Sequence, residues 1–301
     1  MKVSYLLRRY EQGEIDFTGI DLQGVDLRGV ILIGVNLSKA NLMGANLSRA
    51  FLIRVKLEGA CLHRTNLSFA KMNEAFLGDA DLTKANLSGA FLVKSQLPNV
   101  QMSGAILVGA NLRAATLTNA NLCAGDLNGI NLRGADLTGA NLKWANLGGA
   151  RLSAAKLAGT KFTGVNLRGA CLNGVNLAQV ELDGVNLSQA RLNGANLTAA
   201  KLMGANLSYA QMRAARLSRA NLTGANLEGV CLKRANLSSA QLSDADLTDA
   251  DLTDAQLKGV KLHRTRLTGA ILPESVQQNI ELSSAIFSLT SSSMSNGMSA
   301  S

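Results

Sequence analysis

The sequence contains few of the residues from which enzymes usually build active sites. Only two histidines, four cysteines and one tryptophan occur among 301 residues, and aromatic residues make up 4% of the chain. The histidines, His63 and His263, are 200 positions apart, and neither forms a recognisable pair with a nucleophile. No phosphate-binding loop and no calcium-loop spacing occurs. The sequence therefore predicts no catalytic activity, no cofactor and no metal site.

Long hydrophobic runs and a secretion signal are also missing. No stretch approaches the roughly 18 apolar residues that a membrane span requires. Arg8, Arg9, Glu11 and Glu14 interrupt the N-terminal region before an apolar signal segment could form. We therefore predict a cytoplasmic protein without transmembrane insertion.

Charge of one sign is in modest excess. The chain has 30 basic and 21 acidic residues, which gives a formal net charge of +9. Such a surplus suits an acidic partner, although it is small for a chain of this length.

A five-residue repeat runs through almost the whole chain. Leucine occupies 47 of the 52 positions that follow one another at intervals of five from Phe17 to Leu272, and methionine or phenylalanine fills the rest. Two residues before each of these central positions stands a small residue, mostly alanine or valine. Because no insertion or deletion breaks the register, the body of the protein is one repeat array.

The period excludes a helix and a long strand. Five residues advance about 500° on a helix, so successive leucines would form no stripe. In a strand the small and the central residue share a face, but the next small residue follows after three positions and breaks the alternation. The chain must therefore turn in every repeat. Of 29 glycines, 24 stand two residues after a central position, where a type II turn needs a positive φ.

The tandem unit A(N/D)LxG over residues 15–272 resembles the pentapeptide-repeat family. The resemblance implies an all-β fold, a right-handed quadrilateral parallel β-helix in which four pentapeptides make one coil. On that fold the repeats give about 13 coils and a rod roughly 60 Å long. We expect an irregular coil, if there is one, near Pro98 or Gly125. One column of asparagines should form a ladder of stacked amides; its members are Asn46, Asn66, Asn86, Asn146, Asn166, Asn186, Asn206 and Asn226.

The two ends of the array carry different sequences. Residues 1–14 predict an N-terminal capping helix, because Val3, Leu6, Leu7 and Tyr10 share one helical face. The opening LLRRYEQGEIDF is similar to the start of several cyanobacterial members of the family, including one that regulates heterocyst formation. After the β-helix of residues 15–272, residues 273–301 predict a C-terminal cap and a Ser-rich disordered tail.

Apolar residues replace polar ones at a group of outward positions near the N-terminal end of the rod. With four repeats per coil, Ile31 stacks under Phe51 and Ile33 under Ile53. Such clusters mark contact surfaces more often than scattered apolar residues do, although isoleucine and phenylalanine are also good strand formers. The predicted protein-contact patch consists of Ile31, Ile33, Phe51, Ile53, Arg54, Phe91, Val93, Lys94, Ile106 and Val108.

Basic residues continue along the same face. An acidic protein or a polyanion could bind them, but no aromatic residues interleave with them as nucleic-acid binding would favour, and a solvated face also explains them. This basic stripe consists of Arg113, Arg133, Arg151, Arg191, Arg213, Lys233 and Arg234. Further along, SDADLTDADLTDA places five aspartates around one coil, which we interpret as a collar that opposes end-to-end association.

The cysteines face outward on this fold, and those that share a face lie roughly 14 Å apart, too far for a disulfide. Free thiols suit a reducing compartment. The four are Cys61, Cys123, Cys171 and Cys231.

Together these features predict a non-enzymatic protein-binding, scaffold or regulatory protein that acts through an exposed face of the rod. A DNA-mimic protein that interacts with topoisomerase is an alternative within the family, but mimicry requires a strongly negative rod and this chain carries +9. Binding of a polyanion or an anionic surface through the basic stripe is a further alternative. The partner and the oligomeric state stay open.

Overall fold

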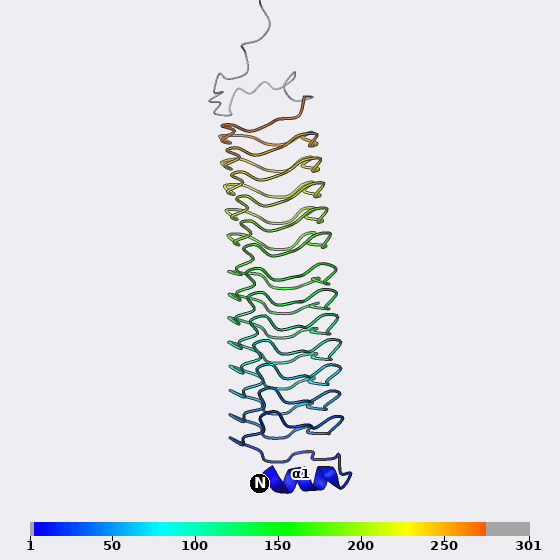
Figure 1. The fold of residues 1–301 in the computed structure, drawn as a ribbon. Coiled ribbons are helices and arrows are strands. Elements are labelled where there is room, and N and C mark those ends of the chain that lie inside the picture. Colours follow the sequence, from blue (N-terminus) through cyan, green and yellow to red (C-terminus); the bar gives the residue numbers. More distant parts are fainter. Residues whose placement is uncertain (1–2, 275–301) are drawn as a thin grey trace, which may run out of the picture.

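The computed structural model describes residues 3–274, which form one short helix followed by a straight rod (Figure 1). Helix α1 spans Val3–Glu11. From there the chain winds in parallel coils. In nearly every repeat an isolated β-bridge joins the residue before the central position to the residue 20 positions later, from Asp16↔Asn36 to Asp251↔Ile271. Since the repeat is five residues long, four repeats complete each coil. The extended pieces are so short that no longer strand forms.

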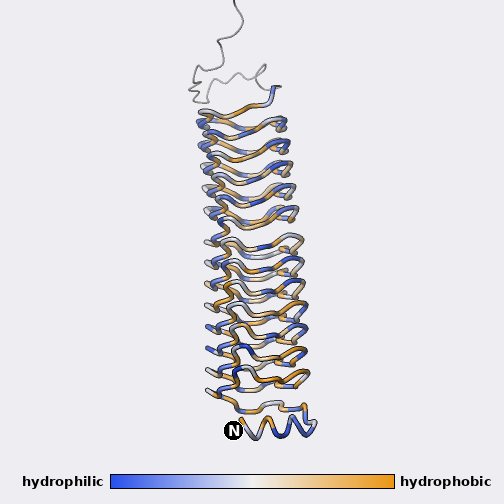
Figure 2. Tube along the Cα trace, viewed as in Figure 1, coloured by the Kyte–Doolittle hydropathy of each residue, from blue (hydrophilic) through white to orange (hydrophobic). Residues whose placement is uncertain are grey.

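The core is a continuous column inside the coils. Central leucines and the small residues that precede them are buried along most of the rod; the exceptions lie in the first coil, in the last coil and at Val180. Leu52, for example, is 1% exposed, while its neighbour Phe51 points outward and is half-buried. Inward apolar residues and outward polar residues alternate along the chain, so apolar and polar segments follow each other around every coil (Figure 2). No single central core exists, because burial is distributed over the length of the rod.

Each coil presents four faces. Following the chain, we number them by their central residues, which are Leu37 on face 1, Leu42 on face 2, Leu47 on face 3 and Leu52 on face 4. The ladder between coils uses the same bonds on every face. The Leu52 N–H donates to the Lys71 carbonyl at 2.8 Å, and the Phe51 N–H donates to the Val30 carbonyl at 2.7 Å.

The corners are four-residue turns whose third residue has a positive φ, as the type II prediction requires. The turn after Leu52 is closed by the Val55 N–H, which donates to the Leu52 carbonyl at 3.2 Å. Glycine fills only part of this column, and 27 other residues adopt the same left-handed conformation. Ala154, with φ 60°, is one of them. A side chain there costs on the order of 1 kcal/mol, so packing holds these turns in a conformation that their sequence disfavours.

Four buried hydroxyls stand in the column of small residues, and all are satisfied in the same way. Thr65 Oγ1 donates to the Leu42 carbonyl at 2.7 Å, and Thr160 Oγ1 donates to the Leu137 carbonyl at 2.9 Å. Ser95 and Thr265 make equivalent bonds. A hydroxyl is therefore tolerated in the core because a turn of the preceding coil, 23 residues earlier, offers it a carbonyl.

The predicted amide ladder is wrong for most of its column. Of the neighbouring pairs, only Asn166 donates to Asn146, at 3.0 Å. The side-chain oxygen instead accepts a hydrogen bond from the N–H two residues on, as Asn66 does from Ser68 at 3.1 Å. This local bond needs no particular neighbour in the next coil, and it explains why asparagine or aspartate fits nearly every coil.

Helix α1 covers the N-terminal end of the rod (Figure 1). Leu6 is buried, and Val3, Leu7 and Tyr10 pack against the core of the first coil. Gly13, with φ 91°, follows the helix, and Arg9 forms an ion pair with Glu14. Pro273 is buried at the other end, and the rest of the predicted C-terminal cap and tail, residues 275–301, lies outside the described residues. Within residues 3–274 no helix has the length and apolar character that crossing a bilayer demands.

The coils at Pro98 and Gly125 are regular, so the expectation of an irregular coil there is wrong. Leu97 donates to Thr116 at 2.7 Å, and Asn146 donates to the Gly125 carbonyl at 2.9 Å. Pro98 occupies the second position of its turn, where the ladder uses no N–H and where a fixed φ near −65° is suitable.

The ladder is interrupted elsewhere, on faces 1 and 2. Bridges 156–176 and 161–181 are absent, and with them eight backbone hydrogen bonds that neighbouring coils make. Faces 3 and 4 stay paired, as in the bond from Leu167 to Asn186 at 2.7 Å. Figure 1 shows the wider interval in the green part of the rod. Phe162 stands at the centre of this region, and it is the only central phenylalanine with a coil on both sides. Its ring is larger than the leucine at most central positions, so we infer that its size contributes to the interruption. Size is not sufficient, because Phe17 donates to the Asn36 carbonyl of the next coil at 2.8 Å.

Candidate functional site

The predicted protein-contact patch lies mainly on face 4, where its apolar side chains are stacked from coil to coil. Bridges join Ile31 to Phe51, Phe51 to Lys71 and Lys71 to Phe91. Ile31 is 55% exposed, and Ile33 and Phe91 are exposed as well, whereas Phe51 is half-buried. Lys71 Nζ lies 4.2 Å from the centre of the Phe51 ring, so this lysine covers the phenylalanine with its charged end.

Phe69 extends this surface and was missed by the sequence reasoning. It stands at the corner between faces 3 and 4 in the same coil as Lys71, and it is 53% exposed. Its ring lies over Gly89 in the next coil, because a Cβ on that glycine would come within 2.5 Å of it. The available signal was an aromatic residue at a turn position that otherwise carries mostly glycine or a polar residue.

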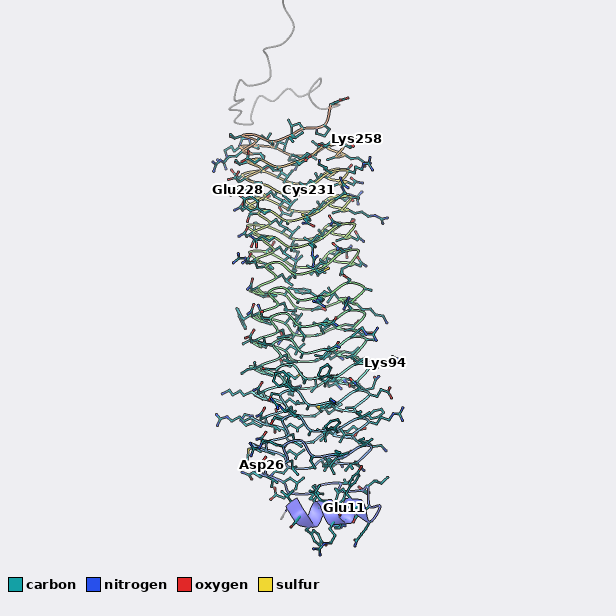
Figure 3. The ribbon with its side chains drawn as sticks, in the orientation of Figure 1. Glu11, Asp26, Lys94, Glu228, Cys231 and Lys258 are labelled. Atoms are coloured by element: carbon teal, nitrogen blue, oxygen red, sulfur yellow. The ribbon has the colours of Figure 1, made fainter. Side chains whose placement is uncertain are left out.

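The remaining residues of the patch form its edges. Ile53 and Val93 are half-buried. Arg54 is exposed but pairs with Glu74 at 2.9 Å. Lys94 projects from the side of the rod and has no ion pair among residues 3–274 (Figure 3). Ile106 and Val108 are exposed on face 3, the face before the patch, and thus widen it around the corner.

Tyr10 of α1 connects the N-terminal end to the patch. Its hydroxyl accepts a hydrogen bond from the Ile33 N–H at 3.2 Å and lies 3.4 Å from the Ile33 carbonyl, to which it donates. The patch therefore begins directly beside the helix that covers the first coil.

Two residues of the basic stripe form ion pairs, and the other five do not. Lys233 pairs with Asp251 at 2.9 Å, and Arg234 pairs with Asp254 at 3.6 Å. The other five, Arg113, Arg133, Arg151, Arg191 and Arg213, form no ion pair within the described rod.

The aspartate collar is largely neutralised by those and other pairs. Asp244 pairs with Arg264 at 2.7 Å and Asp246 with Arg266 at 3.2 Å. Burial opposes ionisation of Asp246 and Asp251, but hydrogen bonds from Thr248 and Thr253 and the neighbouring cations outweigh it and lower both pKa values. A collar whose carboxylates are paired supplies little repulsion, so its predicted role is weakened.

The described residues offer no metal site and no disulfide. No group of three potential ligands among histidine, cysteine, aspartate and glutamate comes together in residues 3–274. The four cysteines are free and half-buried. Cys171 Sγ lies 3.3 Å from Ser153 Oγ and has no thiol partner.

A cleft of about 910 Å³ occupies the place where the ladder is interrupted. We call it the slot. Residues 154–165 form its N-terminal edge, and residues 173–186 form its C-terminal edge. Lys156 and Lys161 stand on its N-terminal edge. Leu157 and Phe162, beneath it, are buried at 2% and 1% exposure, and Val180 is half-buried.

Trp144, the single tryptophan of the chain, lies beside the slot. Its side chain is 63% exposed, at the corner between faces 2 and 3. A Cβ on Gly164 would come within 2.5 Å of the indole, so the ring lies over a residue of the N-terminal edge. Phe69 and Tyr209 cover a glycine of the following coil in the same way, but the ladder next to them is intact.

Comparison with known proteins identifies the class of protein that this geometry defines. The family model described as Pentapeptide repeats matches overlapping segments that run without a gap from residues 15–59 to residues 235–273. The chain therefore belongs to the pentapeptide-repeat family, whose members fold as right-handed quadrilateral β-helices. No curated protein matches the chain.

Among solved structures, the chain is similar to HetL, a pentapeptide-repeat protein involved in heterocyst differentiation regulation from the cyanobacterium Nostoc sp. strain PCC 7120. The identity is 31%, the match covers 91% of this chain and 98% of HetL, and the TM-score is 0.40. A pentapeptide-repeat protein of the Arabidopsis thaliana thylakoid lumen is 27% identical over 37% of this chain and 74% of its own, with a TM-score of 0.28. QnrB1, a plasmid-mediated fluoroquinolone resistance protein, is 21% identical over 74% and 91%, with a TM-score of 0.31.

Proposed function

We propose that this protein is a non-enzymatic binding protein that holds a partner protein on the patch of face 4. The observation that carries the proposal is the stack of outward apolar residues at Ile31, Phe51 and Phe91, in a vertical column that carries mostly polar residues on the coils beyond. A rigid rod suits such a role because its faces keep their side chains at fixed spacing.

Local structure does not account for the patch. The short extended pieces form equally well with asparagine, lysine or arginine in the same column, as the bridges Asn111↔Asn131 and Asn131↔Arg151 illustrate. Strand preference alone is therefore a weak reason for isoleucine and phenylalanine here, and exposed apolar clusters favour a contact surface.

The charges around the patch favour an acidic rim on the partner. Lys94 is unpaired within residues 3–274, and Lys71 offers its ammonium group above the Phe51 ring. An aromatic anchor surrounded by cations is typical of the buried centre of a protein interface with a polar rim. The regulatory role of HetL in heterocyst differentiation is one setting in which such binding could operate.

The test replaces Phe51 by Asn and Ile53 by Ser in the full chain and compares partner capture from the native host. We expect the double variant to keep its fold and to retain at most a tenth of the captured partner. Phe76→Asn is the matched control, because Phe76 occupies the same column position on face 1 and is 39% exposed. Capture that is equal for wild type, control and double variant would remove the patch as the binding surface.

A polyanion is the second candidate partner, because five arginines of the basic stripe lack an ion pair in the described rod. This alternative predicts that affinity falls steeply with salt. In a gel-shift at two ionic strengths, Arg133→Gln should weaken binding and flatten the salt dependence, whereas Arg234→Gln, which removes a paired cation, should change little. Binding that is insensitive to salt would exclude this candidate.

Mimicry of DNA has less support than either, because the net charge of +9 has the wrong sign for it. The free thiols agree with the proposed cytoplasmic location, where cysteines stay reduced.

A further inference from the structure

Face 4 continues without a missing bridge from the patch to the end of the basic stripe. Nine successive bridges connect Ile31 to Gln211, and they include Arg151↔Cys171 and Cys171↔Arg191, at the height where faces 1 and 2 lose their pairing. Neighbouring coils are about 4.8 Å apart, so the nine intervals extend over roughly 43 Å. The patch and the basic stripe therefore lie in line on one face, at fixed positions relative to each other.

Face 4 differs from the other faces in the sign of its charges. Over residues 91–234 this face and the corner that follows it carry no aspartate or glutamate, whereas each of the other three faces carries both signs over the same residues. Elsewhere opposite charges pair between neighbouring coils, as Lys156 does with Asp136 at 3.3 Å and Lys201 with Glu181 at 2.6 Å. A face that only has to stay solvated would mix both signs. The segregation on face 4 thus favours a ligand that brings its own anionic groups.

The free arginines of the basic stripe are suited to carboxylates. Each guanidinium group is planar and binds a carboxylate through two parallel hydrogen bonds. The row extends over five coils, roughly 24 Å, and Lys94 continues its positive charge toward the patch. All five arginines are exposed, namely Arg113, Arg133, Arg151, Arg191 and Arg213.

A polypeptide fits this surface better than a nucleic acid does. Guanidinium groups bind phosphates as well as carboxylates, so the surroundings decide. Single strands stack their bases on aromatic side chains, but face 4 carries no aromatic residue from residue 92 to residue 274. A duplex would reach beyond one face, where Asp126 and Glu228 on face 3 would repel its phosphates; neither forms an ion pair within residues 3–274. A nucleic acid would also leave the apolar side chains of the patch uncovered.

We propose that the patch and the basic stripe form one bipartite docking surface for a single acidic segment of a partner protein. An apolar anchor of this segment contacts Ile31 and Phe91, which are 55% and 43% exposed, and its carboxylates follow along the arginines. Phe51 in the patch and Arg151 in the middle of the stripe are five coils apart, so anchor and carboxylates are separated by roughly 24 Å. The proposal rests on the function proposed above and adds the chemistry and the length of the partner segment.

The first experiment selects ligands for the full chain from a displayed library of random 24-residue peptides. We expect the selected peptides to place apolar residues at one end and at least three aspartates or glutamates at the other, because a linked segment gains from both contacts. Selected peptides without acidic enrichment over the input library, or a selection that yields no peptide, would overturn the proposal.

The second experiment measures the affinity of the best selected peptide, labelled with fluorescein, by anisotropy. The stripe variant changes three free arginines of face 4: Arg133→Gln, Arg151→Gln and Arg191→Gln. The control variant removes the same charge elsewhere, at exposed arginines without an ion pair in the described rod: Arg168→Gln, Arg216→Gln and Arg219→Gln. We expect at least tenfold weaker binding to the stripe variant and an affinity within threefold of wild type for the control. Equal weakening in both would mean that net charge alone attracts the peptide, and would overturn the docking surface.

The third experiment tests whether the patch and the basic stripe must share a face. One additional repeat, a copy of residues 220–224, is inserted after Ala114 and moves the later arginines by a quarter turn onto face 1. Four such copies complete a coil and return these arginines to face 4. We expect at least tenfold weaker binding for the chain with one copy and an affinity within threefold of wild type for the chain with four. If the chain with one copy binds as tightly as wild type, the two parts do not act as one surface.

The double variant Phe51→Asn with Ile53→Ser separates the failure of this proposal from the failure of the proposed function. A peptide that loses affinity for the double variant alone leaves the patch as a protein-binding surface and excludes the stripe from it. A peptide that loses affinity for the stripe variant alone also overturns the bipartite surface, and its displacement by an oligothymidylate would then assign the stripe to polyanions. If neither variant changes the affinity, both proposals fail. A loss of at least tenfold in each of the two variants is the result expected here.

Discussion

Two stretches of the rod, around Thr65 and around Thr160, have a threonine at the same position of the five-residue repeat but differ in the backbone hydrogen bonds to the next coil. Each threonine is buried and donates to a carbonyl 23 residues earlier. The Thr65 carbonyl accepts from the Asn86 N–H at 3.0 Å, whereas the corresponding bond from Glu181 to Thr160 is missing. Leu67 follows the first threonine and Phe162 the second. We infer that the central side chain contributes to whether neighbouring coils pair, together with its surroundings, because Phe17 keeps its bond to the next coil.

The comparison also shows that a repeat protein tolerates a local loss of pairing without breaking its fold. Two faces lose their bonds, while the other two continue to hold the coils together. Because each coil contacts only its neighbours, the disturbance stays local.

The largest expected effect is the conversion of the regular stretch into an interrupted one. Leu67→Phe should open a second slot and lower the free energy of unfolding by about 3 kcal/mol, because a larger ring is forced into a filled core. Urea unfolding measures the loss, and hydrogen exchange shows whether ladder amides around residues 62–69 become exposed. Leu67→Met is the control, since methionine already fills three central positions. Unchanged exchange in the phenylalanine variant would mean that ring size is not the cause.

The reverse substitution should repair the interrupted stretch. Phe162→Leu restores the usual central residue, and the backbone bonds it allows should raise the free energy of unfolding by about 2 kcal/mol. Exchange at Leu157 and Glu181 should slow to the rate of the neighbouring coils. A variant whose exchange stays fast would show that the interruption has another origin.

A smaller effect separates the turns that precede the two stretches. Gly59 and Ala154 occupy equivalent positions and both have positive φ, 63° and 60°. Ala154→Gly should stabilise the rod and Gly59→Ala should destabilise it, each by about 1 kcal/mol, because a Cβ is strained in this conformation. Paired urea curves measure both. Destabilisation by Ala154→Gly would indicate that the turn beside the slot does not keep the left-handed conformation.

The smallest effect is a dependence on acid in the Thr160 stretch alone. Hydrogen bonding from Thr138 and, less strongly, the nearby Lys156 lower the pKa of Asp136, which therefore favours the fold above the carboxyl pKa of the unfolded chain. This contribution is lost as pH falls through the lowered pKa. The equivalent residue below Thr65 is Asn41, which does not titrate. Between pH 7 and a pH below 4, wild type should lose about 0.5 kcal/mol more of its free energy of unfolding than Asp136→Asn does. An equal loss in both proteins would mean that other carboxylates cause the acid sensitivity.

The five-residue period was enough to predict most of the fold. The features that it did not predict depend on local packing. The five-residue register placed Leu52 inside and Phe51 outside, as the structure has them, because inward and outward positions follow directly from the corners. The position of the interruption could not be derived in that way. Pro98 was the more suspicious residue by its chemistry, yet it tolerates its turn, while Phe162 still matches the apolar pattern and differs only in volume.

The surfaces were predictable to the extent that they depend on columns alone. Ile31 and Ile33 are exposed as their columns require. Phe69 and Trp144 were missed because turn positions were read for glycine and not for the aromatic residues that cover a glycine in the next coil. The ion pairs of Lys233 and Arg234 with aspartates of the collar could not be predicted, since they depend on side-chain conformations that the repeat pattern does not define.

The link between each residue and the one 20 positions later has a consequence for insertions and deletions. Deletion of 20 residues would shorten the rod by one coil, and every later side chain would stay on the same face. Loss of five residues would preserve the core equally well but rotate everything downstream by a quarter turn. The patch and the far half of the basic stripe would then point in different directions, although every leucine remained buried.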